Sequence, residues 1–240
     1  MAFRAAGKTD AGLARKENQD SMLILSDRSI YAIADGMGGH AGGRQASAMA
    51  IGALTRALDR DGEVDEAGVE RALADANAGI MKEADEKKWE GMGTTLVLAF
   101  YAEGWWRVAH IGDSRAYVVN RDGIYALTKD HSLVGELLAH GSITREEARV
   151  HPHRNVLTRA LGADGDPKPE WSRVRAEDAE YLLLCSDGLY NMIEEDSIRA
   201  TVLAPDLTPE EKTDRLVKEA NNQGGLDNIT VILIAKEGGL

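Results

Sequence analysis

The order of strand-like and helix-like segments constrains the fold of this chain most strongly. Two apolar segments, 21–25 and 29–35, are followed by two amphipathic helical patterns. Four more strand-like segments then come in succession, at 94–100, 105–112, 115–120 and 123–128. Strands that follow each other directly pair as antiparallel hairpins, whereas a parallel sheet needs a crossover helix between strands. We therefore expect antiparallel sheets with helices outside them, and a four-strand antiparallel meander over 94–128.

The expected helices show apolar side chains along one face and capping residues at the start. The first face is formed by Ala46, Ala50, Ala53, Leu54, Ala57 and Leu58, and the second by Val69, Leu73, Ala76, Ile80 and Ala84. Capping boxes at Thr144–Glu147 and Thr208–Glu211 predict two later helices, the second ending at about residue 222. Further strands are expected at 171–176, 180–187 and 227–235.

The length and composition of the chain limit the functions that it can have. The chain has 240 residues, and we expect one domain over 1–240. It contains no apolar run long enough to span a bilayer, and residues 1–20 lack an apolar signal core, so we expect a cytoplasmic protein that does not bind membranes. The net charge of −12 argues against general nucleic-acid binding.

Five aspartates stand at the ends of strand-like segments. Asp20 and Asp227 precede strands, while Asp35, Asp113 and Asp187 follow them. The start of one antiparallel strand lies beside the end of its neighbour, so these carboxylates can meet on one rim. Aspartate is also common in ordinary turns, which explains any one of them without a site. A converging cluster would need protons or cations for neutralisation, and oxygen ligands favour Mg²⁺ or Mn²⁺.

The glycine-rich segment 33–43, IADGMGGHAGG, has several interpretations. Gly36, Gly38 and Ala41 match the dinucleotide-binding pattern, but that fold needs a parallel strand where a second helix is expected. A phosphate-binding P-loop is excluded because Arg44 follows the last glycine in place of Lys and Ser or Thr. Glycines that let Asp35 and a backbone carbonyl face a metal ion fit the segment better.

Cys185 is the single cysteine and a possible nucleophile. Cysteine phosphatases need an arginine six positions later to hold the phosphate, and this chain has Asn191 there. Cys185 ends the apolar run YLLLC, so we expect a buried core residue.

Seven motifs, taken together, strongly resemble the metal-dependent serine/threonine protein phosphatases of type 2C in their compact bacterial form. They are ARKENQD (14–20), ADGMGGHAGG (34–43), GMGTTLV (91–97), HIGDSRAY (110–117), TKDHS (128–132), CSDGLYNMI (185–193) and GLDNITVILI (225–234). Their order extends the resemblance from about residue 7 to residue 235, nearly the whole chain.

The resemblance implies an α+β fold with four αββα layers, in which a central β-sandwich of two antiparallel sheets is flanked by helix pairs. It implies a flap segment near 130–162. It also implies hydrolysis of phosphoserine and phosphothreonine by a water molecule activated at a binuclear Mn²⁺ or Mg²⁺ centre, and a third ion that binds more weakly.

The resemblance further implies roles for individual residues. Asp35 would bridge the two ions, with the Gly36 carbonyl helping to bind one of them. Asp187 and Asp227 would hold the other ion, and Asp20 would support bound water.

Apart from the ligands of the two central ions, the resemblance assigns Asp113 to a third ion and Arg15 to the substrate phosphate. Many eukaryotic relatives have histidine two residues after the bridging aspartate, where this chain has Met37. His40 is then the candidate proton donor to the leaving group, with metal-bound water as the alternative. Asn191 replaces an aspartate of some relatives, which should weaken the third site.

Three functions are compatible with these residues. The leading one is a phosphatase for phosphorylated proteins, its substrates being those of a serine/threonine kinase. A non-catalytic phosphoprotein-binding module of the same fold would be expected to lack a central ligand, but all three aspartates are present. A phosphatase dedicated to one small regulatory protein is the third.

Overall fold

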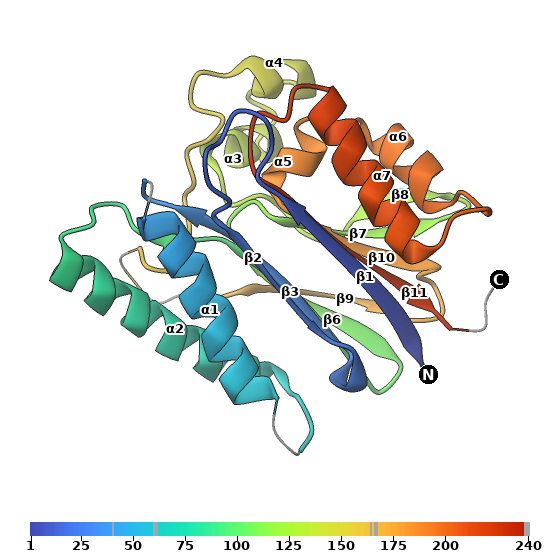
Figure 1. Ribbon diagram of the computed structural model, residues 1–240, viewed down its shortest axis with the longest axis horizontal. Coiled ribbons are helices and arrows are strands. Elements are labelled where there is room, and N and C mark those ends of the chain that lie inside the picture. The colour runs from blue at the N-terminus through green and yellow to red at the C-terminus, as the bar shows by residue number, and fades with distance from the viewer. Residues whose placement is uncertain (40, 60–61, 164, 166–167, 238–240) are drawn as a thin grey trace.

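Two antiparallel sheets pack face to face in the computed structural model, which describes residues 1–39, 41–59, 62–163, 165 and 168–237 (Figure 1). The first sheet has the order β1 (Phe3–Asp10), β11 (Ile229–Lys236), β10 (Tyr181–Cys185), β7 (Arg115–Asn120) and β8 (Gly123–Ala126). The second has the order β2 (Asp20–Leu25), β3 (Ile30–Met37), β5 (Leu96–Ala102), β6 (Trp105–Ile111) and β9 (Glu170–Arg175), with β4 (Gly93–Thr94) paired to β3. The chain therefore forms a β-sandwich.

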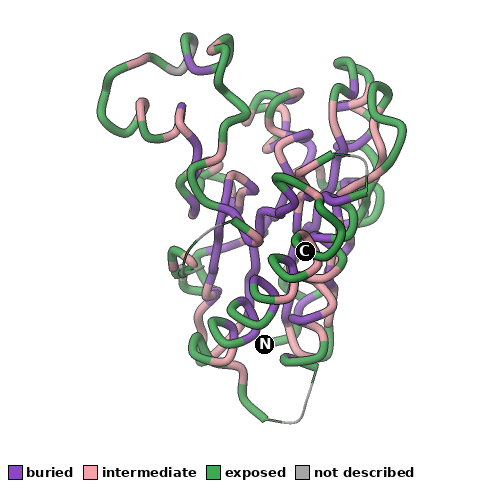
Figure 2. Tube along the Cα trace, turned by 90° about the vertical axis from the view of Figure 1, so that its left-hand side faces the viewer, coloured by how far each residue is buried: buried purple, intermediate pink, exposed green. Residues whose placement is uncertain are grey.

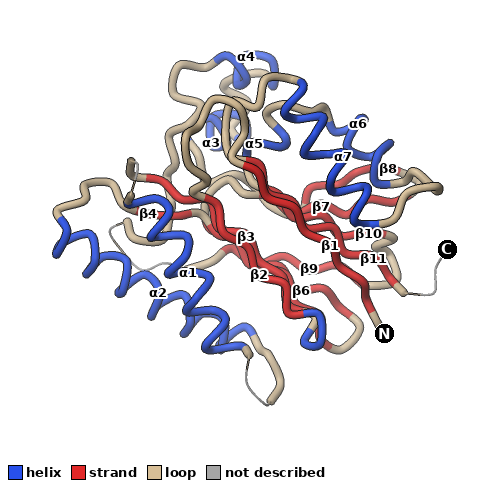
Figure 3. The backbone as a smooth tube through the Cα atoms, viewed as in Figure 1, coloured by secondary structure: helices blue, strands red, loops and turns tan. Residues whose placement is uncertain are grey.

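Helices cover the outer faces of both sheets. Figure 3 shows one helix pair on each side of the strands, with short helices at one end of the sandwich. The second sheet is covered by α1 (Gly42–Leu58) and α2 (Glu66–Lys87), and the first by α5 (Asp187–Tyr190), α6 (Glu195–Val202) and α7 (Pro209–Asn222). The remaining helices are α3 (Leu133–Ala139), α4 (Arg145–Val150) and a short 3₁₀ turn, η1 (Ser26–Arg28). The expected four-layer αββα arrangement is confirmed.

The apolar core is divided among the three interfaces between these layers. Tyr31, Trp106 and Ile232 are buried between the two sheets. One outer core lies under α1 and α2, and the other under α5, α6 and α7. In Figure 2 the buried residues run through the middle of the molecule and along the inner sides of the helices.

The predicted meander over 94–128 is wrong. β5 and β6 form a hairpin in the second sheet, whereas β7 and β8 form a hairpin in the first. Between them the chain crosses from one sheet to the other at residues 112–114, and Gly112 has a φ of 97° in this turn. β6 then pairs with β9 and β7 with β10, so alternation of apolar residues identified the strands but not their sheets.

The helix predictions are confirmed at most positions. Both capping boxes are present, and α7 ends at Asn222. Ala57 is exposed, however, so its assignment to the buried face of α1 is wrong. The strand ladders among the described residues are all antiparallel, and α2 follows α1 directly, which excludes the dinucleotide-binding alternative.

The described residues contain no helix that is both long and apolar enough to cross a membrane.

Candidate metal centre

The five aspartates meet where strand ends and loops from both sheets come together. Asp20 and Asp35 stand opposite each other in the β2–β3 ladder. The blue loop before β2 lies beside the red segment before β11 in Figure 1, where Leu13 N–H donates to the Gly225 carbonyl at 2.8 Å. This contact brings Asp227, the residue two before β11, close to the start of β2.

Asp20 is buried and held by two hydroxyl groups of the first sheet. Its Oδ2 accepts hydrogen bonds from Ser186 Oγ at 2.8 Å and Thr230 Oγ1 at 2.6 Å. Its Oδ1 is buried without a hydrogen-bond partner among the described residues. Burial raises the pKa of Asp20 to about 6, against the effect of the two hydroxyls.

Asp35 is fixed through its backbone. Its N–H donates to Thr95 Oγ1 at 3.0 Å, and its carbonyl accepts from Thr95 N–H at 2.8 Å and from Thr94 Oγ1 at 2.9 Å. Burial raises the pKa of the Asp35 carboxyl well above its usual range, and the charges of the other four aspartates raise it further. The other four carboxyls therefore lie close enough to Asp35 to act on its charge.

Asp187 begins α5 directly after β10. Asn191 Nδ2 donates to Asp187 Oδ2 at 3.1 Å, and Asp187 Oδ1 is buried without a hydrogen-bond partner in the described part of the chain. Burial, followed by the charges of Asp113 and Asp227, raises the pKa of Asp187 well above its usual range. Arg15 opposes that rise.

Asp227 differs from the other carboxylates because it forms an ion pair. Arg15 Nη2 lies 2.7 Å from Asp227 Oδ2, and the side chains are 55% and 33% exposed. Asp227 Oδ1 accepts from the N–H of Asn228 at 2.9 Å. The pair is therefore open to solvent, and both partners are accessible from the surface.

Asp113 lies in the turn after β6. Burial and the nearby Asp130 raise its pKa to about 6, against the opposing charge of Arg115. Tyr190 Oη donates to the Asp113 carbonyl at 3.0 Å, which ties this turn to α5.

Gly36 occupies a position where any side chain would force the neighbouring backbone to shift. A Cβ atom there would lie 2.1 Å from the Gly43 carbonyl oxygen and 2.7 Å from that of Gln19. The glycine-rich segment therefore allows the end of β3 to approach the first turn of α1 and the residue before β2.

Two other sequence predictions concern residues around the centre. His40 lies outside the described residues. Cys185 is fully buried, and burial raises its pKa to about 12, so the thiol is a core residue with little thiolate at neutral pH.

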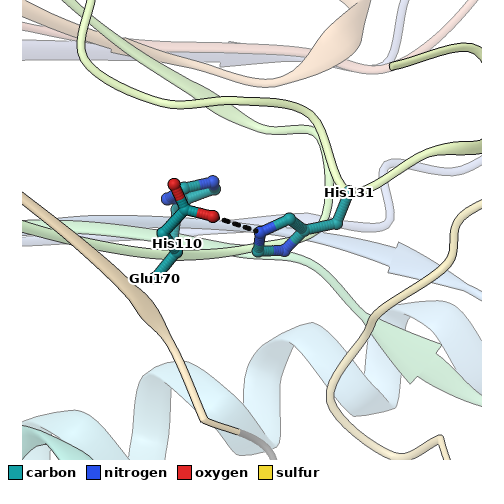
Figure 4. Close-up of side chains that lie close together, drawn as sticks. All are labelled: His110, His131 and Glu170. Atoms are coloured by element: carbon teal, nitrogen blue, oxygen red, sulfur yellow. Dashed lines mark hydrogen bonds and ion pairs between the residues drawn. The ribbon is translucent and has the colours of Figure 1, made fainter. Parts of the chain in front are cut away.

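No three of the described aspartates place their carboxylate oxygens within 4.8 Å of one another. Among the described residues, only His110, His131 and Glu170 place three ligand atoms within 4.8 Å of one another (Figure 4). The Asp227 carboxylate forms an ion pair with Arg15, and the Asp187 carboxylate accepts a hydrogen bond from Asn191. The donor atoms still suit a hard divalent cation, because they are carboxylate oxygens. Two of them, Asp20 Oδ1 and Asp187 Oδ1, are buried and have no hydrogen-bond partner within the described ranges.

Sequence reasoning missed the neutral residues that hold these carboxylates. Ser186 and Thr230 bond to Asp20, and Asn228 Oδ1 accepts from Gln19 N–H at 2.8 Å. The sequence contained a signal for these three residues, because each is a polar residue that lies beside or within an apolar strand segment. A polar side chain buried in such a place needs a partner.

A family model for protein phosphatase 2C matches residues 14–221. Protein phosphatase PhpP of Streptococcus pneumoniae is 40% identical over 235 residues, which cover 95% of each protein. The crystal structure of serine/threonine phosphatase Stp1 from Staphylococcus aureus has a TM-score of 0.92 and 34% identity, with 99% of this chain and 96% of that chain covered.

A third relative contains metal. The catalytic domain of the serine/threonine protein phosphatase PstP, solved in complex with two manganese ions, has a TM-score of 0.86 and 34% identity over 97% of both chains. This chain therefore belongs to the bacterial branch of the protein phosphatase 2C family of metal-dependent serine/threonine protein phosphatases.

Proposed function

We propose that Asp35, Asp187 and Asp227, with the Gly36 carbonyl, hold two divalent cations, Mn²⁺ or Mg²⁺, at which the chain dephosphorylates phosphoserine and phosphothreonine in proteins. The observation that carries this proposal is the convergence of five partly or fully buried carboxylates, and burial raises the pKa of Asp20, Asp35, Asp113 and Asp187. Such a cluster is unfavourable at neutral pH without cations.

When bound, the two cations supply positive charge to the phosphate oxygens and lower the pKa of a water molecule. The residues of the chain provide the negative charge that binds them. Asp187 and Asp227 are held by neighbouring amide donors, which limits their motion.

Arg15 is the proposed phosphate-binding residue. A guanidinium group can donate two parallel hydrogen bonds to a phosphate, which an ammonium group cannot reproduce. Arg15 pairs with Asp227 at the edge of the centre, so a phosphate dianion has to compete with that carboxylate for the guanidinium. Binding of a cation by Asp227 would release Arg15 for the substrate.

Protonation of the leaving alkoxide is assigned to His40, with a water molecule as the alternative. A general acid matters for a poor leaving group and hardly at all for a good one. The His40→Ala variant should therefore lose activity on a phosphoserine peptide but keep it on p-nitrophenyl phosphate. Equal rates for variant and wild type on both substrates would assign the proton to water.

The third cation is proposed to bind weakly at Asp113. Asn191 donates a hydrogen bond to Asp187. Because its side chain is a neutral amide, it adds no negative charge to the site of the third cation. The 130–162 segment is proposed as a flap that helps select substrates. The partners would be phosphoproteins modified by a serine/threonine kinase, in the cytoplasm.

One assay tests the proposal. A phosphothreonine peptide is incubated with the protein plus Mn²⁺, with a chelator, and with the Asp187→Asn variant. We expect phosphate release only from the wild type with Mn²⁺. The matched control is Asp206→Asn, an exposed residue between α6 and α7, which should behave as wild type. Full activity in chelator would contradict the proposal, and a metal-binding but inactive wild type would support a non-catalytic module.

A further inference from the structure

His131 lies at the junction between the turn that carries Asp113 and the segment proposed as a flap. The residue follows β8 and is 7% exposed. Both nitrogens of its ring have polar neighbours, and the neighbour of one nitrogen comes from a different part of the chain than the neighbour of the other. A buried ring with contacts on both sides is suited to fix two segments relative to each other.

On one side, His131 is joined to Gly112 by two hydrogen bonds. Gly112 N–H donates to His131 Nδ1 at 3.2 Å, and the His131 N–H donates to the Gly112 carbonyl at 2.9 Å. Gly112 directly precedes Asp113 and has a left-handed backbone conformation, with a φ of 97°. The orientation of Asp113 therefore depends on a turn that His131 holds.

The same turn reaches the backbone of Asp35. A Cβ atom on Gly112 would lie 2.7 Å from Thr95 Cγ2, so the turn packs tightly on Thr95. Thr95 Oγ1 in turn accepts from the Asp35 N–H at 3.0 Å and bonds to Ser114 Oγ at 2.7 Å.

On the other side, the ring faces β9 and the end of the 130–162 segment. Figure 4 shows Glu170 Oε2 opposite His131 Nε2, at 3.3 Å. Arg159 Nη1 lies 3.2 Å from the same nitrogen, and Thr158 N–H donates to the His131 carbonyl at 2.9 Å. His131, which stands at the start of this segment, thus contacts the other end of it at Thr158 and Arg159.

The hydrogen-bond pattern argues against a cation at His110, His131 and Glu170. Burial and the stacked His110 ring lower the pKa of His131, so the ring is neutral near pH 7. Because His131 Nδ1 accepts from Gly112, the proton lies on Nε2 and points to Glu170. That nitrogen has no lone pair for a metal ion, and the Arg159 guanidinium beside it would repel one.

We propose that His131 is a positioning residue that holds the Gly112–Asp113 turn against the far end of the 130–162 segment. It thereby sets the Mn²⁺ concentration that the protein needs for activity. The inference rests on the proposed function, because Asp113 is there the ligand of the weaker cation. His131 Nδ1 acts on the metal site through its contact with Gly112, and Nε2 acts on the proposed flap through its neighbours Glu170 and Arg159.

Two variants separate the two nitrogens. In His131→Asn, the amide Oδ1 takes the place of Nδ1 and can still accept from Gly112. In His131→Gln, the amide reaches the place of Nε2 but leaves the Gly112 N–H without its acceptor. Asp206→Asn, in the exposed residue between α6 and α7, is the control.

The first readout is hydrogen exchange at the Gly112 amide in metal-free protein. We expect about tenfold faster exchange in His131→Gln, equivalent to one lost hydrogen bond, and a rate near wild type in His131→Asn. The second readout is the Mn²⁺ concentration that gives half-maximal activity. It should rise about tenfold or more in His131→Gln and stay unchanged in His131→Asn, whose KM for a phosphopeptide should rise instead.

The proposal is overturned if both variants change the two readouts equally, or if His131→Gln changes neither. Should His131→Gln not fold, His131→Asn still decides: a tenfold rise in its Mn²⁺ requirement contradicts the proposal. Hydrogen exchange needs no metal, so a wild type that ignores Mn²⁺ refutes the proposed function without deciding the role of His131.

Discussion

Neutral donors hold the carboxylates of Asp20 and Asp187 at the centre, which leaves their negative charge available to a cation. Asp20 is bonded to two hydroxyls, and Asp187 to an amide. Such donors reduce the cost of burying a carboxylate without cancelling its charge, whereas a salt bridge would cancel it. Asp227 is the exception, and its arginine partner is the residue proposed to bind phosphate.

Raised carboxyl pKa values predict that the metal-free protein loses stability as the pH rises. Burial and Asp130 raise the pKa of Asp113 from 3.8 to about 6. In that window the native state binds more protons than the unfolded chain, so the free energy of unfolding falls with rising pH. Urea unfolding of chelated protein at about pH 4.5 and about pH 7 should show a smaller fall in Asp113→Asn. An identical fall in both proteins would contradict the prediction.

Arg15→Lys tests the phosphate contact. A lysine keeps the charge but loses the paired hydrogen bonds, so the KM for a phosphothreonine peptide should rise about tenfold while kcat changes little. The control is Arg44→Lys, an exposed arginine 3.9 Å from Glu17. An unchanged KM would remove Arg15 from phosphate binding.

At the scale of elements, the end of β3 depends on a close approach between backbones. Gly36→Ala places a Cβ 2.1 Å from the Gly43 carbonyl oxygen, so β3 or α1 must shift. We expect urea unfolding to show a loss of about 2 kcal/mol or more, the range of overpacking and strain. Gly52→Ala, in the middle of α1 with only the Arg56 side chain nearby, should be neutral or stabilising. Equal stabilities for the two variants would contradict this account.

Elements with local chemical signals could be predicted from the sequence, but their partners could not. Thr208 and Glu211 specify the start of α7 by hydrogen bonds within one turn. The crossing between β6 and β7 depends on which free strand edge each hairpin meets, and those edges belong to β9 and β10, far along the chain. The strand β1 pairs with β11 and was not anticipated, since its sequence, FRAAGKTD, has little apolar character.

At the scale of the whole molecule, the sandwich explains how distant residues meet. The aspartates were expected on one rim because each stands at a strand end, and in the structure the charges of the other four raise the pKa of Asp35. Their spacing could not be predicted, since the Arg15–Asp227 ion pair and the Asn191 contact depend on loop packing. Sequence patterns locate strand ends, whereas side-chain distances follow from how two sheets stack.

The most direct test of the account counts the cations. Isothermal titration of the chelator-treated protein with Mn²⁺ should give two strongly bound ions per chain, the number that the PstP catalytic domain binds. Asp35→Asn should lose both, because this carboxylate is proposed to bridge them, while Asp206→Asn should retain them. If Asp35→Asn bound the same two ions with unchanged affinity, the carboxylate cluster would not be the metal centre.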